Sequence, residues 1–215
     1  MTSSPAERAE LERGLAALSL EASPAQLEQW LQHLALLRRW SKSFNLVAPG
    51  ELNQLVPRHL LDSLSIARYL SDGALLDVGS GAGFPGIPLA VLRPELPTLM
   101  VDSAGKKVRF LRQVIRSAGL PAARAEHARI ERFSEAMDFR TITSRAFSSL
   151  ADFAASVRHL AGPQTRLLAM KGQLPEAELK ALPSWAELNE ITALSVPGLE
   201  AERHLVELRL RPDRD

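Results

Sequence analysis

The sequence LLDVGSGAGFPG occupies residues 75–86 and decides which fold the chain can adopt. A short apolar run carrying one acid is followed by four glycines within eight residues, which predicts a buried parallel strand and a tight turn after it. Glycine serves where the backbone takes a positive φ, or where a ligand approaches without a Cβ in between. Pro85 suits the first turn of a helix, because that turn does not need its N–H. Strand, glycine loop and helix form the arrangement that binds nucleoside-bearing cofactors in doubly wound sheets.

The acids around these glycines indicate which cofactor the loop suits. Gly81, Gly83 and Gly86 satisfy the G-x-G-x-x-G pattern, so a dinucleotide oxidoreductase is one hypothesis. Asp77, however, stands two residues before the first glycine, where a pyrophosphate gains nothing from a negative charge but an ammonium group is attracted. Asp102 ends the next apolar run and suits a pair of ribose hydroxyls. The stretch therefore resembles motif I of class I methyltransferases, whose cofactor, S-adenosylmethionine (SAM), carries an ammonium group and no phosphate.

The composition is that of a globular protein without thiol chemistry. The chain has 215 residues, enough for one domain with an extension, of which 46% are apolar and 24% charged. There is no cysteine, which excludes a disulfide scaffold, a thiolate metal site and a cysteine nucleophile. The first residues lack the basic and apolar regions of a signal peptide, and no apolar run approaches membrane-spanning length. We therefore expect a cytoplasmic protein with no membrane partner.

The charge distribution leaves two interpretations open. A formal net charge of +1 does not by itself indicate nucleic-acid binding. Basic residues nevertheless outnumber acids in the middle of the chain, namely Lys106, Lys107, Arg109, Arg112, Arg116, Arg124, Arg129, Arg132, Arg140 and Arg145. They could form a face that meets phosphates, or they could be a solvated helix face.

Residues 1–70 are predicted to form an N-terminal helical extension, and residues 71–215 a SAM-dependent methyltransferase domain. Helices are expected over residues 5–20, from Pro24 to about residue 40, and over residues 51–70. The second begins with a capping box, Ser23 to Gln26. Its apolar residues recur at helical spacing and are expected to pack against the main domain: Leu27, Trp30, Leu31, Leu34 and Leu37.

From residue 74 the pattern alternates between strands and helices, which is typical of an α/β sheet. Seven strands are expected, near residues 74–78, 97–102, 122–126, 139–144, 165–171, 188–196 and 203–210, with helices near residues 86–93, 104–118, 148–160 and 175–182. The last strand alternates apolar and charged residues, so we expect it to be half-exposed and antiparallel at the sheet edge. The predicted fold is a doubly wound, mostly parallel, seven-stranded Rossmann-like sheet with the helical extension before it.

Several further segments resemble one family, the bacterial 16S ribosomal RNA guanine-N7 methyltransferases, also called the glucose-inhibited division protein B family. The resemblance runs from about residue 25 to residue 210, and the sequence after the glycines is its most specific part. The matching segments are Asn45-Leu46, Arg58–Ser63, Asp77–Leu89, Asp102–Leu111, Ser144–Phe147, Met170–Gly172 and Glu202–Val206.

This resemblance implies SAM-dependent methylation of N7 of one guanine, at position 527 in the 530 loop of 16S rRNA. It also implies a set of cofactor contacts, to which the chemistry of the loop adds Asp77 and Gly81. The cofactor-binding residues are then Asp77, Gly79, Gly81, Phe84, Asp102, Ile130, Glu131 and Arg145.

Guanine N7 has an in-plane lone pair and no proton, so we predict no catalytic acid–base residue and no metal. The enzyme would align N7, the methyl carbon and sulfur for in-line displacement. Candidates for holding the guanine or its phosphates are Asn45, Arg58, His59, Arg145 and Lys171. General base catalysis by His59 is the alternative, because histidine titrates near neutral pH.

Other functions remain open from the sequence alone. The chain could methylate a different substrate with SAM, or it could be a non-catalytic ribosome assembly factor with a SAM-binding fold. The preferred partner is 16S rRNA or the small ribosomal subunit, and the expected oligomeric state is a monomer.

Overall fold

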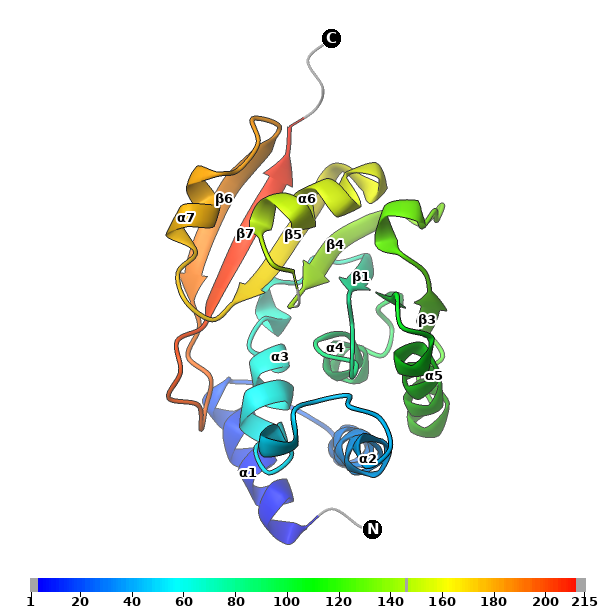
Figure 1. The fold of residues 1–215 in the computed structure, drawn as a ribbon. Coiled ribbons are helices and arrows are strands. Elements are labelled where there is room, and N and C mark those ends of the chain that lie inside the picture. Colours follow the sequence, from blue (N-terminus) through cyan, green and yellow to red (C-terminus); the bar gives the residue numbers. More distant parts are fainter. Residues whose placement is uncertain (1–3, 146, 212–215) are drawn as a thin grey trace.

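The computed structural model describes residues 4–145 and 147–211 (Figure 1). One residue of the predicted Ser144–Phe147 segment, Ala146, lies outside the described residues, as do the outermost residues of both predicted domains. The described chain is built on one seven-stranded sheet with helices on both faces.

The sheet confirms the predicted class. Its strands are β1 (Ala74–Val78), β2 (Thr98–Asp102), β3 (Ala123–His127), β4 (Phe139–Ser144), β5 (Ala161–Lys171), β6 (Ala186–Ala193) and β7 (His204–Leu210). They lie in the order β3-β2-β1-β4-β5-β7-β6, and the first five are parallel. Because strand order reverses direction at β1 and β4, the carboxyl ends of these strands border the crevice where such sheets bind ligands.

The last strand is antiparallel as predicted, but its predicted position at the sheet edge is wrong. β7 lies between β5 and β6, so the edge strand is β6. The expected half-exposure is also wrong at Glu207, which is 4% exposed. Its carboxylate is buried against Arg166, whose Nε donates to Glu207 Oε1 over 2.8 Å. An alternating pattern cannot distinguish a charge facing solvent from one paired inside the sheet.

The helices are α1 (Pro5–Ala17), α2 (Pro24–Ser41), α3 (Asp62–Leu64), α4 (Gly86–Leu92), α5 (Gly105–Ala118), α6 (Leu150–Val157) and α7 (Glu176–Lys180). Short 3₁₀ turns occur at Pro49–Glu51, Ala67–Tyr69, Ile130–Arg132 and Arg158–Leu160. The helix expected over residues 51–70 is broken into several pieces. A π-helical turn, Val56–Leu61, runs directly into α3, and Pro85 is the residue before α4 rather than in its first turn.

The N-terminal helices are fixed to the sheet domain by capping residues and hydrogen bonds. The predicted capping box of α2 is present, with Ser23 and Gln26 each accepting from the other's backbone N–H. The Gln26 amide also donates to the carbonyls of Val91 and Leu92 in α4, over 2.9 and 3.0 Å. Trp30 Nε1 donates to Pro88 O over 3.2 Å. The domain boundary at residue 70 stays a prediction. Side chains of α2, before this boundary, form hydrogen bonds with backbone carbonyls of α4, after it.

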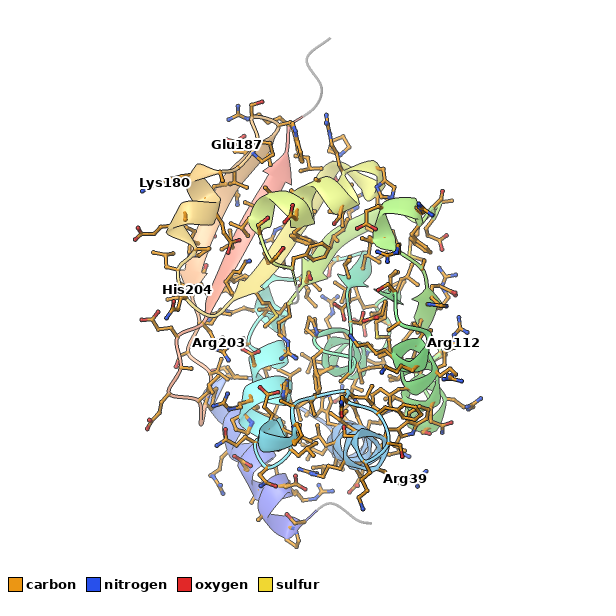
Figure 2. The ribbon with its side chains drawn as sticks, in the orientation of Figure 1. Arg39, Arg112, Lys180, Glu187, Arg203 and His204 are labelled. Carbon is orange, nitrogen blue, oxygen red and sulfur yellow. The ribbon has the colours of Figure 1, made fainter. Side chains whose placement is uncertain are left out.

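The core is divided by the sheet into two main layers (Figure 1). On one face α1, α2, α4 and α5 share a cluster that contains all five apolar residues predicted for α2, each at most 9% exposed. On the other face α6 packs against the sheet through Phe153 and its neighbours. Exposed arginines of α2 and α5, including Arg39 and Arg112, project from the first layer (Figure 2). Within the described residues, no helix is both long and apolar enough to cross a membrane.

Candidate active site

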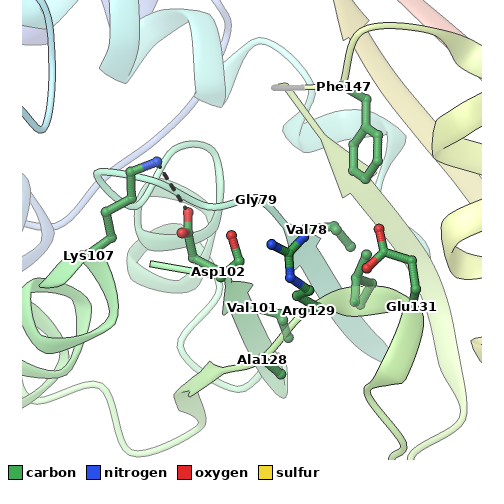
Figure 3. Close-up of a pocket in the computed structure, with 11 residues that line it drawn as sticks. Val78, Gly79, Val101, Asp102, Lys107, Ala128, Arg129, Glu131 and Phe147 are labelled. Carbon is green, nitrogen blue, oxygen red and sulfur yellow. Dashed lines mark ion pairs between the residues drawn. The ribbon is translucent and has the colours of Figure 1, made fainter. Parts of the chain in front are cut away.

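Two pockets lie near the carboxyl ends of the parallel strands. The glycine-loop pocket, about 230 Å³, is lined by Val78, Gly79, Val101, Asp102, Ser103, Lys107, Ala128, Arg129, Ile130, Glu131 and Phe147 (Figure 3). The arginine pocket, about 330 Å³, is lined by Glu51, Arg58, His59, Asp62, Arg145, Met170, Lys171, Gly172 and Arg203. The two pockets meet at the end of β4. Of the residues that follow this strand, Arg145 lines the arginine pocket and Phe147 lines the glycine-loop pocket.

The glycine loop leaves open space on one side and is closely packed on the other. Gly79 and Gly81 have positive φ values of 70° and 57°. A Cβ built on Gly81 would meet only Gly79 O, at 3.8 Å, so a ligand can approach this part of the backbone closely. A Cβ on Gly86 would lie 2.7 Å from Asp77 Oδ2, so the helix start needs glycine to pack over that acid.

Asp77 lies beneath the loop rather than on a pocket wall. Its side chain is fully buried, and Oδ2 accepts the Gly86 N–H over 2.9 Å. Oδ1 is buried and has no hydrogen-bond partner among the described residues. Burial raises the pKa of this carboxyl to about 7, against the effect of the Gly86 hydrogen bond. Direct contact with a cofactor ammonium group stays a prediction.

Asp102 joins the end of β2 to the glycine loop. Its Oδ2 accepts the Gly81 N–H over 2.9 Å, and its Oδ1 accepts the Ala104 N–H over 2.8 Å. Lys107 Nζ lies 3.6 Å from Oδ2, as the dashed line in Figure 3 marks. The carboxylate thus sets the shape of the loop while lining the pocket, and each of its oxygens retains a lone pair for a hydroxyl donor.

Of the residues predicted to bind cofactor, Gly79, Asp102, Ile130 and Glu131 line the glycine-loop pocket. Gly81 does not line it, but is bonded through its N–H to Asp102, which does. Arg129 and Phe147 also point into it, together with Glu131 (Figure 3). No role was predicted for Arg129, although it directly precedes Ile130 in the sequence.

Phe84 and Arg145 lie on the other side of the loop. The Phe84 ring is 2% exposed, with His33 and His59 centred 4.9 and 5.1 Å from it. Arg145 Cζ is 5.3 Å from the same ring. His33, from α2, also holds the loop through Nε2, which lies 2.8 Å from Ala82 O. Phe84 therefore supports the loop from within the core, and Arg145 faces the arginine pocket.

Asp62 is the centre of the arginine pocket. Its Oδ2 accepts from Arg145 Nη1 over 3.2 Å, and its Oδ1 accepts from Arg203 Nε over 3.0 Å. Asp62 is 2% exposed, and burial raises its pKa while the two guanidiniums act in the opposite direction. One buried carboxylate thus joins three chain segments that are distant in sequence, and Arg203 lies where β7 begins (Figure 2).

His59 bridges an arginine and an acid in this pocket. Arg145 Nη2 donates to His59 Nδ1 over 2.9 Å, and His59 Nε2 lies 3.2 Å from Glu51 Oε2. Since a guanidinium only donates, Nδ1 must accept, which places the ring proton on Nε2. Burial, and then the charge of Arg145, lower the His59 pKa to about 4. Nε2 is buried and makes no hydrogen bond with the described residues despite the short distance to Glu51. Because Nδ1 already accepts from Arg145 and Nε2 carries the proton, the neutral ring has no free basic nitrogen, and this geometry does not favour His59 as a general base.

The remaining RNA candidates are placed differently. Arg58 lines the arginine pocket, whereas Asn45 is exposed and lines neither pocket. Lys171 also lines the arginine pocket, but Nζ lies 2.8 Å from Glu178 Oε2 and donates to Phe147 O over 3.3 Å. Its ammonium group therefore already joins β5 to α7.

Comparison with known proteins identifies the family. The family model described as rRNA small subunit methyltransferase G matches residues 26–206. The chain belongs to this family. It is 47% identical over 205 residues to the ribosomal RNA small subunit methyltransferase G of Xanthomonas axonopodis pv. citri, covering 95% of this chain and 96% of the relative. It is 45% identical over 204 residues to the ribosomal RNA small subunit methyltransferase G of Chromobacterium violaceum, covering 94% of this chain and 98% of the relative.

Solved structures share the fold at low sequence identity. A TehB-like SAM-dependent methyltransferase from Corynebacterium glutamicum has a TM-score of 0.56 at 16% identity, covering 84% of this chain and 98% of that one. A SAM-dependent methyltransferase from Aquifex aeolicus has a TM-score of 0.56 at 17% identity, covering 79% and 98%. The class I methyltransferase fold, the methyltransferase activity on rRNA and the SAM cofactor expected from the sequence are thereby confirmed.

The open side of the glycine loop gives this methyltransferase a testable SAM site. Gly81→Ala is expected to weaken SAM binding at least tenfold, because the added methyl group enters the space that the loop leaves for a ligand. The loss of folding stability should be only about 1 kcal/mol, the usual cost of a positive φ. Calorimetric titration with SAM and urea unfolding measure the two effects.

Gly119→Ala is the matched control. Gly119, at the end of α5, has φ +62° and no neighbour within 4 Å of a built Cβ. The strain is therefore the same, but the Gly119 N–H bonds only to carbonyls of α5, whereas the Gly81 N–H donates to Asp102, which lines the glycine-loop pocket. Equal SAM affinities of the two variants would contradict the assignment of Gly81.

Proposed function

We propose that this methyltransferase transfers the methyl group of SAM to N7 of one guanine of 16S rRNA, guanine 527 in the 530 loop. The proposal includes the small ribosomal subunit as partner, a monomeric enzyme and a cytoplasmic location, where ribosomal RNA is found. The observation that carries it is the pair of neighbouring pockets, one bounded by the glycine loop and Asp102, the other rich in arginine. The first suits a nucleoside cofactor and the second suits a nucleotide of RNA.

The residues of the glycine-loop pocket fit SAM chemically. Asp102 provides acceptors for ribose hydroxyls and Ile130 provides an apolar wall. Gly81 does not line the pocket itself, but its N–H donates to Asp102 and its backbone leaves space that a ligand can approach. We assign Gly79, Gly81, Asp102, Ile130 and Glu131 to direct contact. Asp77, Phe84 and Arg145 act in this proposal by holding the loop and its surroundings in place.

Bound SAM supplies a methyl group on a positively charged sulfur. In the transfer, a bond forms between guanine N7 and the methyl carbon while the carbon–sulfur bond breaks, and its electron pair remains on sulfur. No proton moves, so the reaction needs no general base, in agreement with His59, whose basic Nδ1 is already occupied by Arg145. The work left to the protein is to align the two reactants and exclude competing orientations.

Contacts to the rest of the RNA would come from residues around the arginine pocket. Arg58 lines its wall, and Asn45 is exposed on the loop between α2 and the 3₁₀ turn Pro49–Glu51. Lys171 contributes positive charge to the pocket and holds α7 in place through its ion pair with Glu178. The exposed arginines of α5 would extend the surface toward phosphates, with residues 1–70 as part of the RNA-facing platform.

The test is methyl transfer from labelled SAM to small ribosomal subunits prepared from cells that lack this enzyme. Chemical cleavage at 7-methylguanosine then maps the labelled nucleotide. We expect one labelled guanine in the 530 loop. Label at another nucleotide would overturn the proposed target, and SAM binding without transfer to subunits or free rRNA would indicate another substrate or an assembly role.

A further inference from the structure

Glu51 is an acid in a pocket dominated by cations. It ends the 3₁₀ turn Pro49–Glu51 and contributes to the wall of the arginine pocket. Its side chain is 36% exposed, so its carboxylate is reachable from the pocket. Glu51 lies outside the segments that resemble the family, so no role was predicted for it.

The other acid of this pocket is already paired with two arginines. Asp62 is 2% exposed, and each of its oxygens already accepts from an arginine, over 3.2 Å from Arg145 and 3.0 Å from Arg203. Glu51 is therefore the remaining carboxylate among the described residues that line the arginine pocket.

Glu51 lies beside His59. His59 Nε2, the nitrogen that carries the ring proton, lies 3.2 Å from Glu51 Oε2 but makes no hydrogen bond among the described residues. Glu51 Oε1 forms no hydrogen bond or ion pair within the described part of the chain, so it is able to accept hydrogen bonds from a ligand. A carboxylate at this position offers a ligand acceptors only.

Guanine is the base whose edge matches such a group. Its Watson–Crick edge presents N1–H and the 2-amino group, two adjacent donors, whereas adenine presents an acceptor at N1. A carboxylate therefore attracts guanine and repels adenine, although both bases have a methylatable N7. A site built to bond a donor discriminates strongly against an analogue that lacks it.

Charge gives the same group a second effect. Methylation at N7 leaves the guanine ring with a positive charge, which the nearby guanidiniums of Arg58, Arg145 and Arg203 oppose. Asp62 offsets Arg145 and Arg203, but its charge is already shared between these two guanidiniums. A carboxylate on the base would stabilise the charge as it develops in the transition state.

We propose that Glu51 is the specificity-determining residue of this methyltransferase, binding N1–H and the 2-amino group of the target guanine. This inference rests on the proposed function, because it needs a guanine in the arginine pocket.

The experiment compares small ribosomal subunits that carry guanosine or inosine at the target nucleotide. Inosine keeps N7 and N1–H but lacks the 2-amino group. For the unmodified enzyme we expect kcat/KM to be about tenfold lower on inosine, the value of one hydrogen bond to a charged acceptor. For Glu51→Ala we expect kcat/KM on guanosine to fall about 100-fold and the penalty for inosine to disappear, with SAM affinity unchanged.

Glu21→Ala is the matched control, since Glu21 is exposed and lines neither pocket. It should keep both the rate and the inosine penalty. Should Glu51→Ala be too slow to measure, Glu51→Gln decides, and its inosine penalty should be clearly below tenfold. A penalty that stays tenfold in a Glu51 variant overturns the inference, whereas failure of the unmodified enzyme to label guanosine subunits overturns the proposed function instead.

Discussion

Asp62→Ala is expected to lower the free energy of unfolding by about 3 kcal/mol and to abolish methyl transfer, because it leaves two guanidiniums without their counter-charge. Arg145 and Arg203 approach Asp62 from opposite sides of one carboxylate, and their side chains are only 25% and 21% exposed. Water can therefore replace the lost interaction only in part. Urea unfolding measures the stability, and transfer of labelled methyl groups measures the activity.

The matched control is Asp72→Ala. Asp72 also pairs with an arginine, Arg93, over 2.9 Å, but its side chain is 98% exposed. Exposed pairs contribute about 0 to 1 kcal/mol, so this variant should unfold almost as the unmodified protein does. Similar losses in the two variants would mean that the buried position of Asp62 has no special effect on stability.

Asp62→Asn separates charge from shape. The amide keeps one acceptor oxygen but loses the negative charge that offsets Arg145 and Arg203. We expect a loss of stability between those of the two alanine variants, with activity still strongly reduced, because Arg145 would no longer be fixed beside Phe84. Wild-type activity of Asp62→Asn would show that hydrogen-bond geometry alone organises the pocket.

The regular elements of the fold could be predicted because each has a local cause. The run before Gly79 is apolar except for Asp77, as expected of a strand covered on both faces, and β1 is buried at all of its residues. The spacing of Ser23 and Gln26, which form a capping box, is enough to predict where α2 begins. These local signals can be read without knowing how the helices and strands pack against one another.

The site could be predicted only in part, because its key contacts join residues that are far apart in sequence. Asp62 meets Arg145 and Arg203 across separations of 83 and 141 residues. Nothing in the segment around Asp62 indicates these partners. The same holds for β7, since the order in which strands pair depends on packing of the whole sheet and not on the alternation within one strand.

Glu51 illustrates a second reason. The sequence around it, Pro49-Gly50-Glu51, is typical of a turn, and a single acid in a turn is usually solvated. Its contact with His59 depends on the break between the 3₁₀ turn and the π-helical turn Val56–Leu61, which the predicted continuous helix over residues 51–70 did not include.

Asp77→Asn is expected to change how stability depends on pH. The folded-state pKa of Asp77, about 7, is raised above the ordinary aspartate value, so the folded protein holds a proton that the unfolded chain has released. This contribution to stability is complete below the unfolded pKa and is lost as the pH rises through about 7. Asparagine resembles the protonated carboxyl, accepts the Gly86 N–H and does not titrate.

Relative to the unmodified protein, Asp77→Asn should therefore gain about 2.5 kcal/mol between pH 5 and pH 8, at about 1.4 kcal/mol per pH unit over the two units below the folded pKa. Urea unfolding of both proteins at several pH values measures this difference. His33 and His59, whose pKa values burial lowers to about 4, make both proteins more stable as the pH rises above 5, and their effects cancel in the comparison.

The absolute difference in stability between the two proteins depends on how the amide packs, so only the change of this difference with pH is diagnostic. If the difference in free energy of unfolding between the two proteins does not change with pH, Asp77 is already ionised at pH 5. Backbone dipoles of the glycine loop other than the Gly86 N–H would then also stabilise its negative charge.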